Sequence, residues 1–168
     1  FYKTLAESGL KKGVRLSTYT LVRRLVVDAN NRVIGVEAGR IPQDSSVKTE
    51  LQKILKKVNA YQRFFLKKSL AALDKVKQLE ETHGEAVFIR AKKGVVLTTG
   101  SFSFNRSMVK HYAPNYINAM ALGTISCDGS GVVLGQSVGG DVGHMDSVTA
   151  WRSISPPESF VRSVVVNM

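Results

Sequence analysis

The sequence predicts a mixed α/β fold in which a β-hairpin is followed by a long helical insertion and then by further strands and short helices. Three observations lead to this prediction. Residues 20–28 are rich in β-branched side chains and return, after an Asn-containing turn, as a second extended run at residues 33–38. Apolar residues then recur at three- and four-residue steps across residues 47–82. Finally, a chain of 168 residues is long enough for one domain with a buried core.

The segments around the hairpin follow from local signals. Residues 2–12 predict a helix that ends in two lysines and Gly13, because cations and then a glycine are typical of a helix C-terminus. Residues 14–16 predict the beginning of a strand. The hairpin turn is expected at residues 29–32, since asparagine tolerates the left-handed backbone that a tight turn requires.

The insertion, residues 45–84, has an unusual length and charge. No glycine or proline interrupts its apolar periodicity, so it predicts one helix of roughly 35 residues, on the order of 50 Å long, or two helices broken near Ser69. Residues 47–82 hold eight lysines and Arg63 against four acidic residues. A solvated lysine face is the simplest interpretation. A contact with a membrane surface or another subunit stays open, because basic amphipathic helices bind anionic lipids.

Further elements are expected after the insertion. They are strands at residues 86–90 and 95–98, helices at residues 105–112 and 131–138, and a strand within residues 160–166. The short apolar run 95–98 is typical of a strand buried on both faces. Asn105 is the expected N-cap of the first helix.

Two glycine motifs are candidates for chemistry. Thr99, Gly100 and Ser101 follow the strand at 95–98, where the absence of a Cβ would let a pyrophosphate or ribose approach the backbone. Asp128 and Gly129 precede a helix and place a carboxylate and backbone N–H groups at its start. Each motif also has a plain alternative, a glycine turn in the first case and an Asp cap on a Gly-rich packing helix in the second.

Taken in order, the motifs resemble the flavoprotein family of fumarate reductases, succinate dehydrogenase flavoprotein subunits and 3-ketosteroid dehydrogenases, and the last branch most closely. The resemblance covers residues 2–38 and 86–168. The matching positions are Thr20, Val22, Leu25 and Asp28; Val33-Ile34-Gly35-Val36; Thr98-Thr99-Gly100-Ser101-Phe102; Asn105; Tyr112-Ala113-Pro114; Ser126-Cys127-Asp128-Gly129; Gly139-Gly140; and Met145-Asp146. Ser101 and Cys127 depart from the family pattern, because each stands where the family has a glycine.

The resemblance implies a partial FAD-binding, Rossmann-like domain over residues 1–146 and the start of a substrate-covering cap domain over residues 147–168. It implies FAD as the cofactor and hydride transfer between the flavin and an adjacent C–C bond of a small molecule, either a 3-ketosteroid or a substrate like fumarate or succinate. No G-x-G-x-x-G follows a strand in this sequence. The chain is therefore expected to be an internal fragment of a larger enzyme and to be inactive alone.

The resemblance also assigns residues to the cofactor and none to catalysis. Val22 would contact the adenine through its backbone. Thr99, Gly100 and Ser101 would line the dinucleotide cleft. Asp128 and Gly129 would lie near the flavin end, where backbone dipoles tune the ring.

Composition argues against a membrane-spanning protein, an internal disulfide and a metal site. No apolar run approaches the ~18 residues of a membrane-spanning helix. A single cysteine, Cys127, forbids an internal disulfide and a multi-cysteine metal site, which fits a cytoplasmic protein. The three histidines, His83, His111 and His144, lack the spacing of metal ligands, so no metal site is expected.

The net charge of +11 keeps one rival function open, a basic module that binds nucleic acid or a membrane surface. Against nucleic acid, Tyr61, Phe64 and Phe65 fall within the apolar periodicity of the insertion instead of alternating with its lysines. No DNA- or RNA-binding signature is present either. The prediction is therefore a small-molecule substrate and no nucleic-acid partner.

Overall fold

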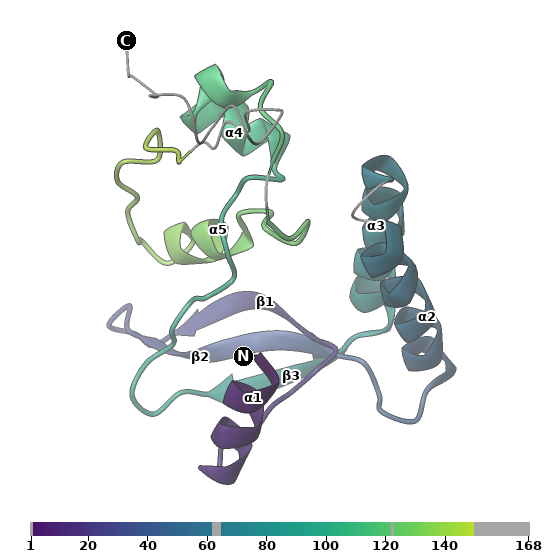
Figure 1. Ribbon diagram of the computed structural model, residues 1–168. Helices are drawn as coiled ribbons and strands as arrows, with labels where there is room; N and C mark the ends of the chain where they lie inside the picture. The colour runs from purple at the N-terminus through teal and green to yellow at the C-terminus, as the bar shows by residue number, and fades with distance from the viewer. Residues whose placement is uncertain (1, 62–64, 122, 150–168) are drawn as a thin grey trace.

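A computed structural model describes residues 2–61, 65–121 and 123–149 and confirms the mixed α/β fold (Figure 1). A three-stranded sheet carries a pair of long helices at one end and a lobe of short helices over one face. The elements are α1 (Tyr2–Lys11), β1 (Thr20–Val27), β2 (Val33–Arg40), α2 (Ser46–Tyr61), α3 (Leu66–His83), β3 (Glu85–Arg90), α4 (Arg106–Tyr112), the 3-10 helix η1 (Pro114–Tyr116) and α5 (Ser130–Gln136).

The predicted hairpin is confirmed as β1 and β2, and β3 extends it into an antiparallel sheet with β2 in the centre. Asp28 fixes the turn, because its Oδ1 accepts hydrogen bonds from the backbone N–H groups of Asn30 and Arg32 at 2.9 and 3.0 Å. Asn31 takes the left-handed conformation at φ 57°, as its residue type favours. The hydrogen bond to the Arg32 backbone lowers the pKa of Asp28.

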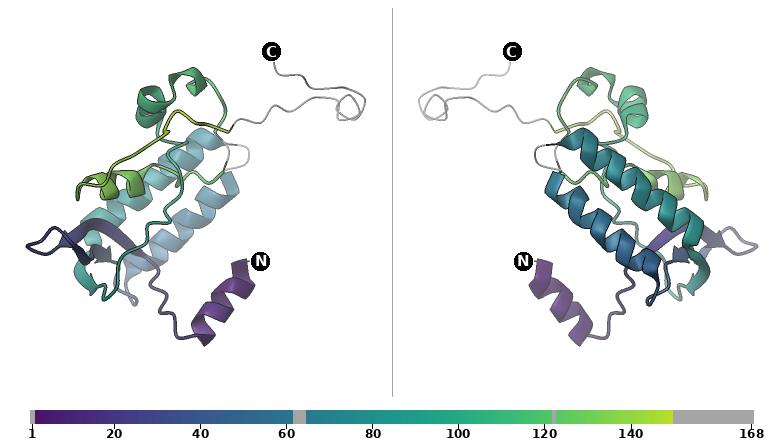
Figure 2. Two further views of the ribbon diagram at one scale, coloured as in Figure 1. Left: turned by 90° about the vertical axis from the view of Figure 1, so that its left-hand side faces the viewer. Right: turned by 90° about the vertical axis from the view of Figure 1, so that its right-hand side faces the viewer.

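The insertion forms two helices that lie side by side (Figure 2). Of the two alternatives, a single helix is wrong and two helices are confirmed, but the break comes before Ser69, because α2 ends at Tyr61 and α3 has already begun at Leu66. Ser69 instead joins the helices: it is fully buried, and its hydroxyl donates to the carbonyl of Val58 at 2.8 Å. Folding the insertion back on itself lets the apolar stripes of both helices bury each other, which a single long helix could not do.

The helix pair and the end of the sheet share a small core. Ile41, directly after β2, and Leu51 of α2 are fully buried, and Val76 of α3 is nearly so. Partly buried residues surround these three, namely Tyr19, Val47, Ile54, Leu55 and Leu79. In the described part of the chain, no helix is both long and apolar enough to cross a membrane.

Two expected strands are absent. Residues 14–16 and 95–98 carry no strand, and Val96 is 84% exposed although it was expected to be buried. A strand needs a partner for its backbone groups, and no strand among the described residues pairs with either segment. The strand expected within residues 160–166 lies outside the described residues.

One arginine fastens the insertion to the sheet. Nη2 of Arg23, on β1, donates to the carbonyl oxygens of Glu80, Glu81 and Gly84 at 3.1–3.3 Å and so satisfies the C-terminal end of α3. A Cβ at Gly39 of β2 would lie 2.7 Å from the same nitrogen. Gly39 is therefore the position where β2 makes room for the guanidinium.

Removing this fastening should destabilise the protein. We expect Arg23→Met to lower the free energy of unfolding by about 1–2 kcal/mol, the usual loss when charged hydrogen bonds at a partly exposed site are removed. Gly39→Ala should act in the same direction, since the new methyl group displaces the guanidinium. Urea denaturation followed by circular dichroism measures both changes. Arg90→Met, at an exposed arginine of β3, is the control, and an equal loss in the control would contradict the role of Arg23.

Candidate functional site

The strand-end motif and the Asp-Gly motif, distant in sequence, lie against each other. The backbone N–H of Gly129 donates to the carbonyl of Ser101 at 3.0 Å, and that of Phe104 donates to the carbonyl of Cys127 at 3.0 Å. All of the predicted cofactor residues except Val22 thus belong to one cluster. Thr99, Gly100 and Ser101 form its exposed strip.

The glycines of this cluster are required by its own packing. Gly100 has φ +88°, and a Cβ there would lie 2.9 Å from Sγ of Cys127. Gly129 has φ +79°, and a Cβ there would collide with Sδ of Met108 and lie 3.0 Å from Cβ of Phe102. Protein atoms therefore already occupy the space beside both glycines. The backbone of the strip and the side chains of Thr99 and Ser101 remain exposed, and the Ser101 hydroxyl is hydrogen-bonded to Ser103.

The two departures from the family pattern fit this arrangement. The side chain of Ser101 is exposed, and its Oγ accepts from the backbone N–H of Ser103 at 3.3 Å. The contact with Gly129 uses the Ser101 carbonyl, so any residue with the same backbone could make it. Cys127 is a free thiol whose sulfur packs on Gly100. The cysteine therefore fills space that Gly100 leaves empty.

The Asp128 carboxylate is held from two sides. Nζ of Lys77 on α3 donates to its Oδ2 at 2.8 Å, and the backbone N–H of Ser130 donates to its Oδ1 at 3.0 Å. Partial burial works to raise the pKa of Asp128, but these hydrogen bonds outweigh it and the pKa is lowered. The carboxylate is thus ionised at neutral pH and ties the insertion to the Asp-Gly motif.

Asn105 holds the other side of the same turn. Its Nδ2 donates to the carbonyl of Asp128 at 2.9 Å, while its Oδ1 accepts from the backbone N–H of Met108 at 3.1 Å. The second bond confirms the predicted N-cap of α4. The first bond was not expected from the sequence, since the N-cap signal says nothing about a residue so far along the chain.

Val22 does not join the cluster. It lies on β1 opposite Ala38, beside an irregularity in the strand register between Val22 and Arg24. Its side chain is 36% exposed. The structure leaves its predicted role at the adenine as a prediction.

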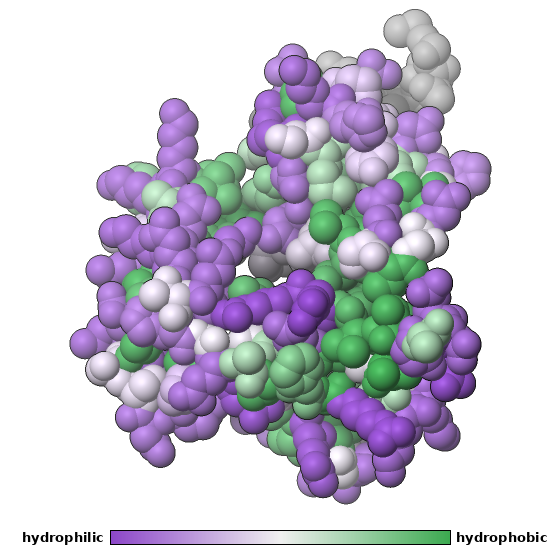
Figure 3. Space-filling model, turned by 180° about the vertical axis from the view of Figure 1, so that it is seen from behind, coloured by the Kyte–Doolittle hydropathy of each residue, from purple (hydrophilic) through white to green (hydrophobic). Residues whose placement is uncertain are grey.

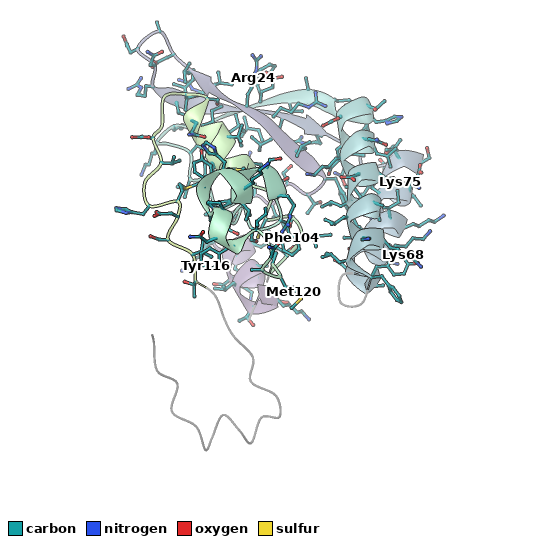
Figure 4. The ribbon with its side chains drawn as sticks, turned by 90° about the horizontal axis from the view of Figure 1, so that it is seen from above. Arg24, Lys68, Lys75, Phe104, Tyr116 and Met120 are labelled. Atoms are coloured by element: carbon teal, nitrogen blue, oxygen red, sulfur yellow. The ribbon has the colours of Figure 1, made fainter. Side chains whose placement is uncertain are left out.

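A hollow of about 790 Å³ adjoins the exposed strip. This volume lies within the range of small-molecule sites. Tyr116 and Met120, on the lobe of short helices, are among the lining residues (Figure 4). The rest of the lining is Ser101, Phe102, Ser103, Arg106, Val109, Ala113, Ala119, Ala121, His144, Met145, Ser147, Val148 and Thr149. Sequence reasoning missed the hollow, because it forms only where the segments around α4 and residues 144–149 come together.

Two of the histidines, His83 and His111, make contacts with residues close to them in sequence. Nδ1 of His83 lies 3.3 Å from the carbonyl of Leu79, and the ring of His111 packs edge-on against Tyr112 at 4.6 Å between centroids. Within residues 2–61, 65–121 and 123–149, no group of three or more His, Cys, Asp or Glu side chains could hold a metal ion.

Comparison with known proteins gives consistent matches. The family described as FAD binding domain matches residues 1–152. A 3-oxo-5-alpha-steroid 4-dehydrogenase of Comamonas testosteroni is 31% identical over 172 residues, covering 100% of this chain and 32% of the relative. The crystal structure of a 3-ketosteroid-delta4-(5alpha)-dehydrogenase from Rhodococcus jostii RHA1, in complex with 4-androstene-3,17-dione, aligns with a TM-score of 0.57 and 27% identity. That alignment covers 85% of this chain and 21% of the other. The chain thus spans about a third of the length of the curated relative.

The packing of Gly129 predicts a large cost for adding a methyl group. Gly139 offers a matched control, because its φ is +86° but nothing lies within 4 Å of the position of its Cβ. Both Gly129→Ala and Gly139→Ala should lose about 1 kcal/mol to backbone strain. Gly129→Ala should lose about 1–3 kcal/mol more through overpacking against Met108 and Phe102. Urea denaturation of both variants measures the difference, and equal losses would refute the packing argument.

The Lys77–Asp128 pair predicts a pH-dependent contribution to stability. Because the pKa of Asp128 is lowered from 3.8, the contribution is complete above pH 3.8 and is lost as the pH falls through the lower folded value. Lys77→Met should therefore destabilise the protein at neutral pH, by roughly 1 kcal/mol or less since both groups are partly exposed. The difference between wild type and variant should shrink below pH 3.8. Urea titrations at neutral pH and below pH 3.8 measure this difference, and Lys75→Met is the control. If Asp128 were not the partner, the difference in stability between wild type and Lys77→Met would be the same at the two pH values.

Proposed function

Because the chain belongs to the family of FAD binding domains, we propose that it forms the central part of an FAD-dependent dehydrogenase or reductase. The proposed reaction transfers a hydride between the flavin and an adjacent C–C bond of the substrate. One observation carries the proposal: the strand-end motif and the Asp-Gly motif meet through the hydrogen bond between Gly129 and Ser101. The relatives, which are named as steroid dehydrogenases, support the reaction class.

In this proposal the cluster binds and orients the cofactor. The hydroxyls and exposed backbone of Thr99 and Ser101 offer hydrogen bonds to the dinucleotide, and Gly100 keeps the strip between them free of a side chain. Asp128 and Gly129 present the start of α5 toward the flavin end, and Val22 offers its backbone to the adenine. FAD, when bound, supplies the ring that accepts and returns the hydride. No residue of this chain is assigned a catalytic role, and we expect the chain by itself to be inactive.

We also propose the domain boundaries that the sequence suggested. Residues 1–146 belong to the FAD domain, with residues 45–84 inserted, and residues 147–168 begin a cap over the substrate. The hollow beside Ser101 supports this boundary, because residues 147–149 line it together with residues of α4 and η1. The residues of the expected cap from 150 onward lie outside the described part of the chain.

For the substrate, we propose a 3-ketosteroid rather than a dicarboxylate such as fumarate or succinate. The lining of the hollow is mainly carbon, with Phe102, Tyr116, Met120 and Val148 among its members. Among the described lining residues, Arg106 is the one arginine or lysine. A dicarboxylate would need several fixed cations to replace its hydration. The steroid bound in the crystal structure of the solved relative, 4-androstene-3,17-dione, has the apolar character that such a lining favours.

A cytoplasmic location belongs to the same proposal, supported by the single, free Cys127. A nucleic-acid module is the rival function. Only the basic net charge favours nucleic-acid binding. The exposed strip, the Asp-Gly turn and the hollow would have no role in such a module.

Flavin binding and turnover by the whole protein test the proposal. We expect the purified protein to carry FAD absorbance and to reduce an artificial electron acceptor with a saturated 3-ketosteroid but not with succinate. Ser101→Tyr should weaken FAD binding on the order of tenfold or more, because the ring would cover the exposed strip. Ser107→Tyr, at an exposed position of α4, is the matched control and should bind FAD normally.

The possible failures are distinguishable. A whole protein without flavin, even after incubation with FAD, would overturn the cofactor assignment. Turnover of succinate in place of the steroid would overturn only the substrate. Equal FAD affinity in wild type and Ser101→Tyr would remove Ser101 from the site.

A further inference from the structure

The end of the helical hairpin that is farthest from Arg23 has an unusual surface. It combines exposed lysines with exposed apolar side chains at the point where α2 ends and α3 begins. We call this surface the basic tip. Its members are Lys56, Lys57, Phe65, Leu66, Lys67 and Lys68, all exposed.

Charge is distributed unevenly along the hairpin. Three of the acidic residues of the two helices, Glu50, Glu80 and Glu81, lie toward the end that joins the sheet, and Asp74 lies at the middle of α3. From Lys53 to Leu73 the sequence contains no aspartate or glutamate. The tip is therefore uniformly positive, whereas the base has charges of both signs. A solvated lysine face would not by itself require this separation.

The apolar members of the tip are also placed unexpectedly. The sequence periodicity put Phe65 on the buried stripe of the insertion, but it is 53% exposed and Leu66 is 41% exposed. Phe65 packs edge-on against Tyr61 with 6.2 Å between ring centroids, and Nζ of Lys68 lies 5.0 Å from the Phe65 ring centre. An aromatic and an aliphatic side chain thus stand together in solvent, each beside lysines.

The position of the hairpin leaves this surface accessible. Figures 1 and 2 show the tip at the end of the hairpin remote from the strands. Lys68 and Lys75 lie on the side of α3 that faces away from the lobe of short helices (Figure 4). Seen from behind, hydrophilic atoms cover most of the hairpin (Figure 3). Because Arg23 holds the other end of α3, the tip projects from a fixed base.

We propose that the basic tip docks on the surface of an anionic phospholipid membrane. The lysines contact the phosphate headgroups, and Phe65 and Leu66 enter the boundary between headgroups and acyl chains. Charge complementarity favours an acidic surface, and the exposed Phe65–Leu66 pair selects lipid among the acidic surfaces. A nucleic acid could stack on Phe65 but offers nothing apolar to cover Leu66. The inference does not depend on FAD or on a steroid substrate.

Vesicle binding tests the proposal. The whole protein is mixed with vesicles of phosphatidylcholine alone, or of equal parts phosphatidylcholine and phosphatidylglycerol, and is separated by flotation. We expect binding only to the anionic vesicles and a decrease with added salt. Lys67→Glu/Lys68→Glu should weaken binding by at least on the order of tenfold, because each lysine contributes near a charged surface. Phe65→Ser/Leu66→Ser should also lose binding while the net charge stays the same.

Matched controls distinguish binding by the basic tip from nonspecific binding through charged or apolar side chains elsewhere on the surface. Lys92→Glu/Lys93→Glu makes the same charge change at an exposed loop, and Val14→Ser/Leu16→Ser removes an exposed apolar pair elsewhere. Both controls should bind like wild type, and unchanged circular dichroism shows that each variant is folded. Equal weakening in the controls, or full binding by Phe65→Ser/Leu66→Ser, would overturn the proposal. The proposal would also be overturned if duplex DNA displaced the protein from the vesicles and the binding to DNA did not depend on Phe65 and Leu66.

Discussion

The arrangement of the whole chain depends on how the helical insertion is fastened to the sheet, and one guanidinium makes that contact. Arg23 on β1 reaches across Gly39 of β2 and satisfies carbonyl groups at the end of α3. The Glu80 carbonyl also accepts from the backbone N–H of Gly84, whereas Glu81 lies in the last turn, where helix carbonyls run out of backbone donors. A charged donor there is worth more than an ordinary surface hydrogen bond. The apolar core around Ile41 then closes the joint. The insertion is therefore part of the fold and has a defined direction relative to the sheet.

The same helix carries a second link, which reaches the candidate site. Lys77 binds Asp128, and the insertion thereby touches the Asp-Gly motif directly. Next to it, burial raises the pKa of Glu80, although the charge of Lys77 opposes that rise. The composition of this lysine-rich segment suggests a solvated appendage, but the segment contacts both the sheet and the candidate site. Its base contacts the sheet and the Asp-Gly motif, and the described residues of the basic tip are exposed.

The space beside two glycines of the candidate site is occupied by protein atoms. Gly100 and Gly129 lie in motifs that the resemblance links to FAD, and it is natural to read such glycines as room for a ligand. Here the room is taken by Cys127 in one case and by Met108 and Phe102 in the other. The glycines hold two loops in contact, and the contact exposes the backbone strip ending at Ser101.

The sequence by itself determined what local chemistry controls: the hairpin and its turn at Asp28, the helical character of the insertion, the N-cap at Asn105 and the ordered motifs of an FAD binding domain. Only the tertiary structure decided where the insertion folds back, that residues 95–98 pair with none of the described strands, and that Lys77 meets Asp128. Periodicity, caps and turns act over a few residues and can be read from neighbouring positions. Strand pairing, the docking of Arg23 and the exposure of Phe65 depend on which distant segments come together, and no local pattern contains that information.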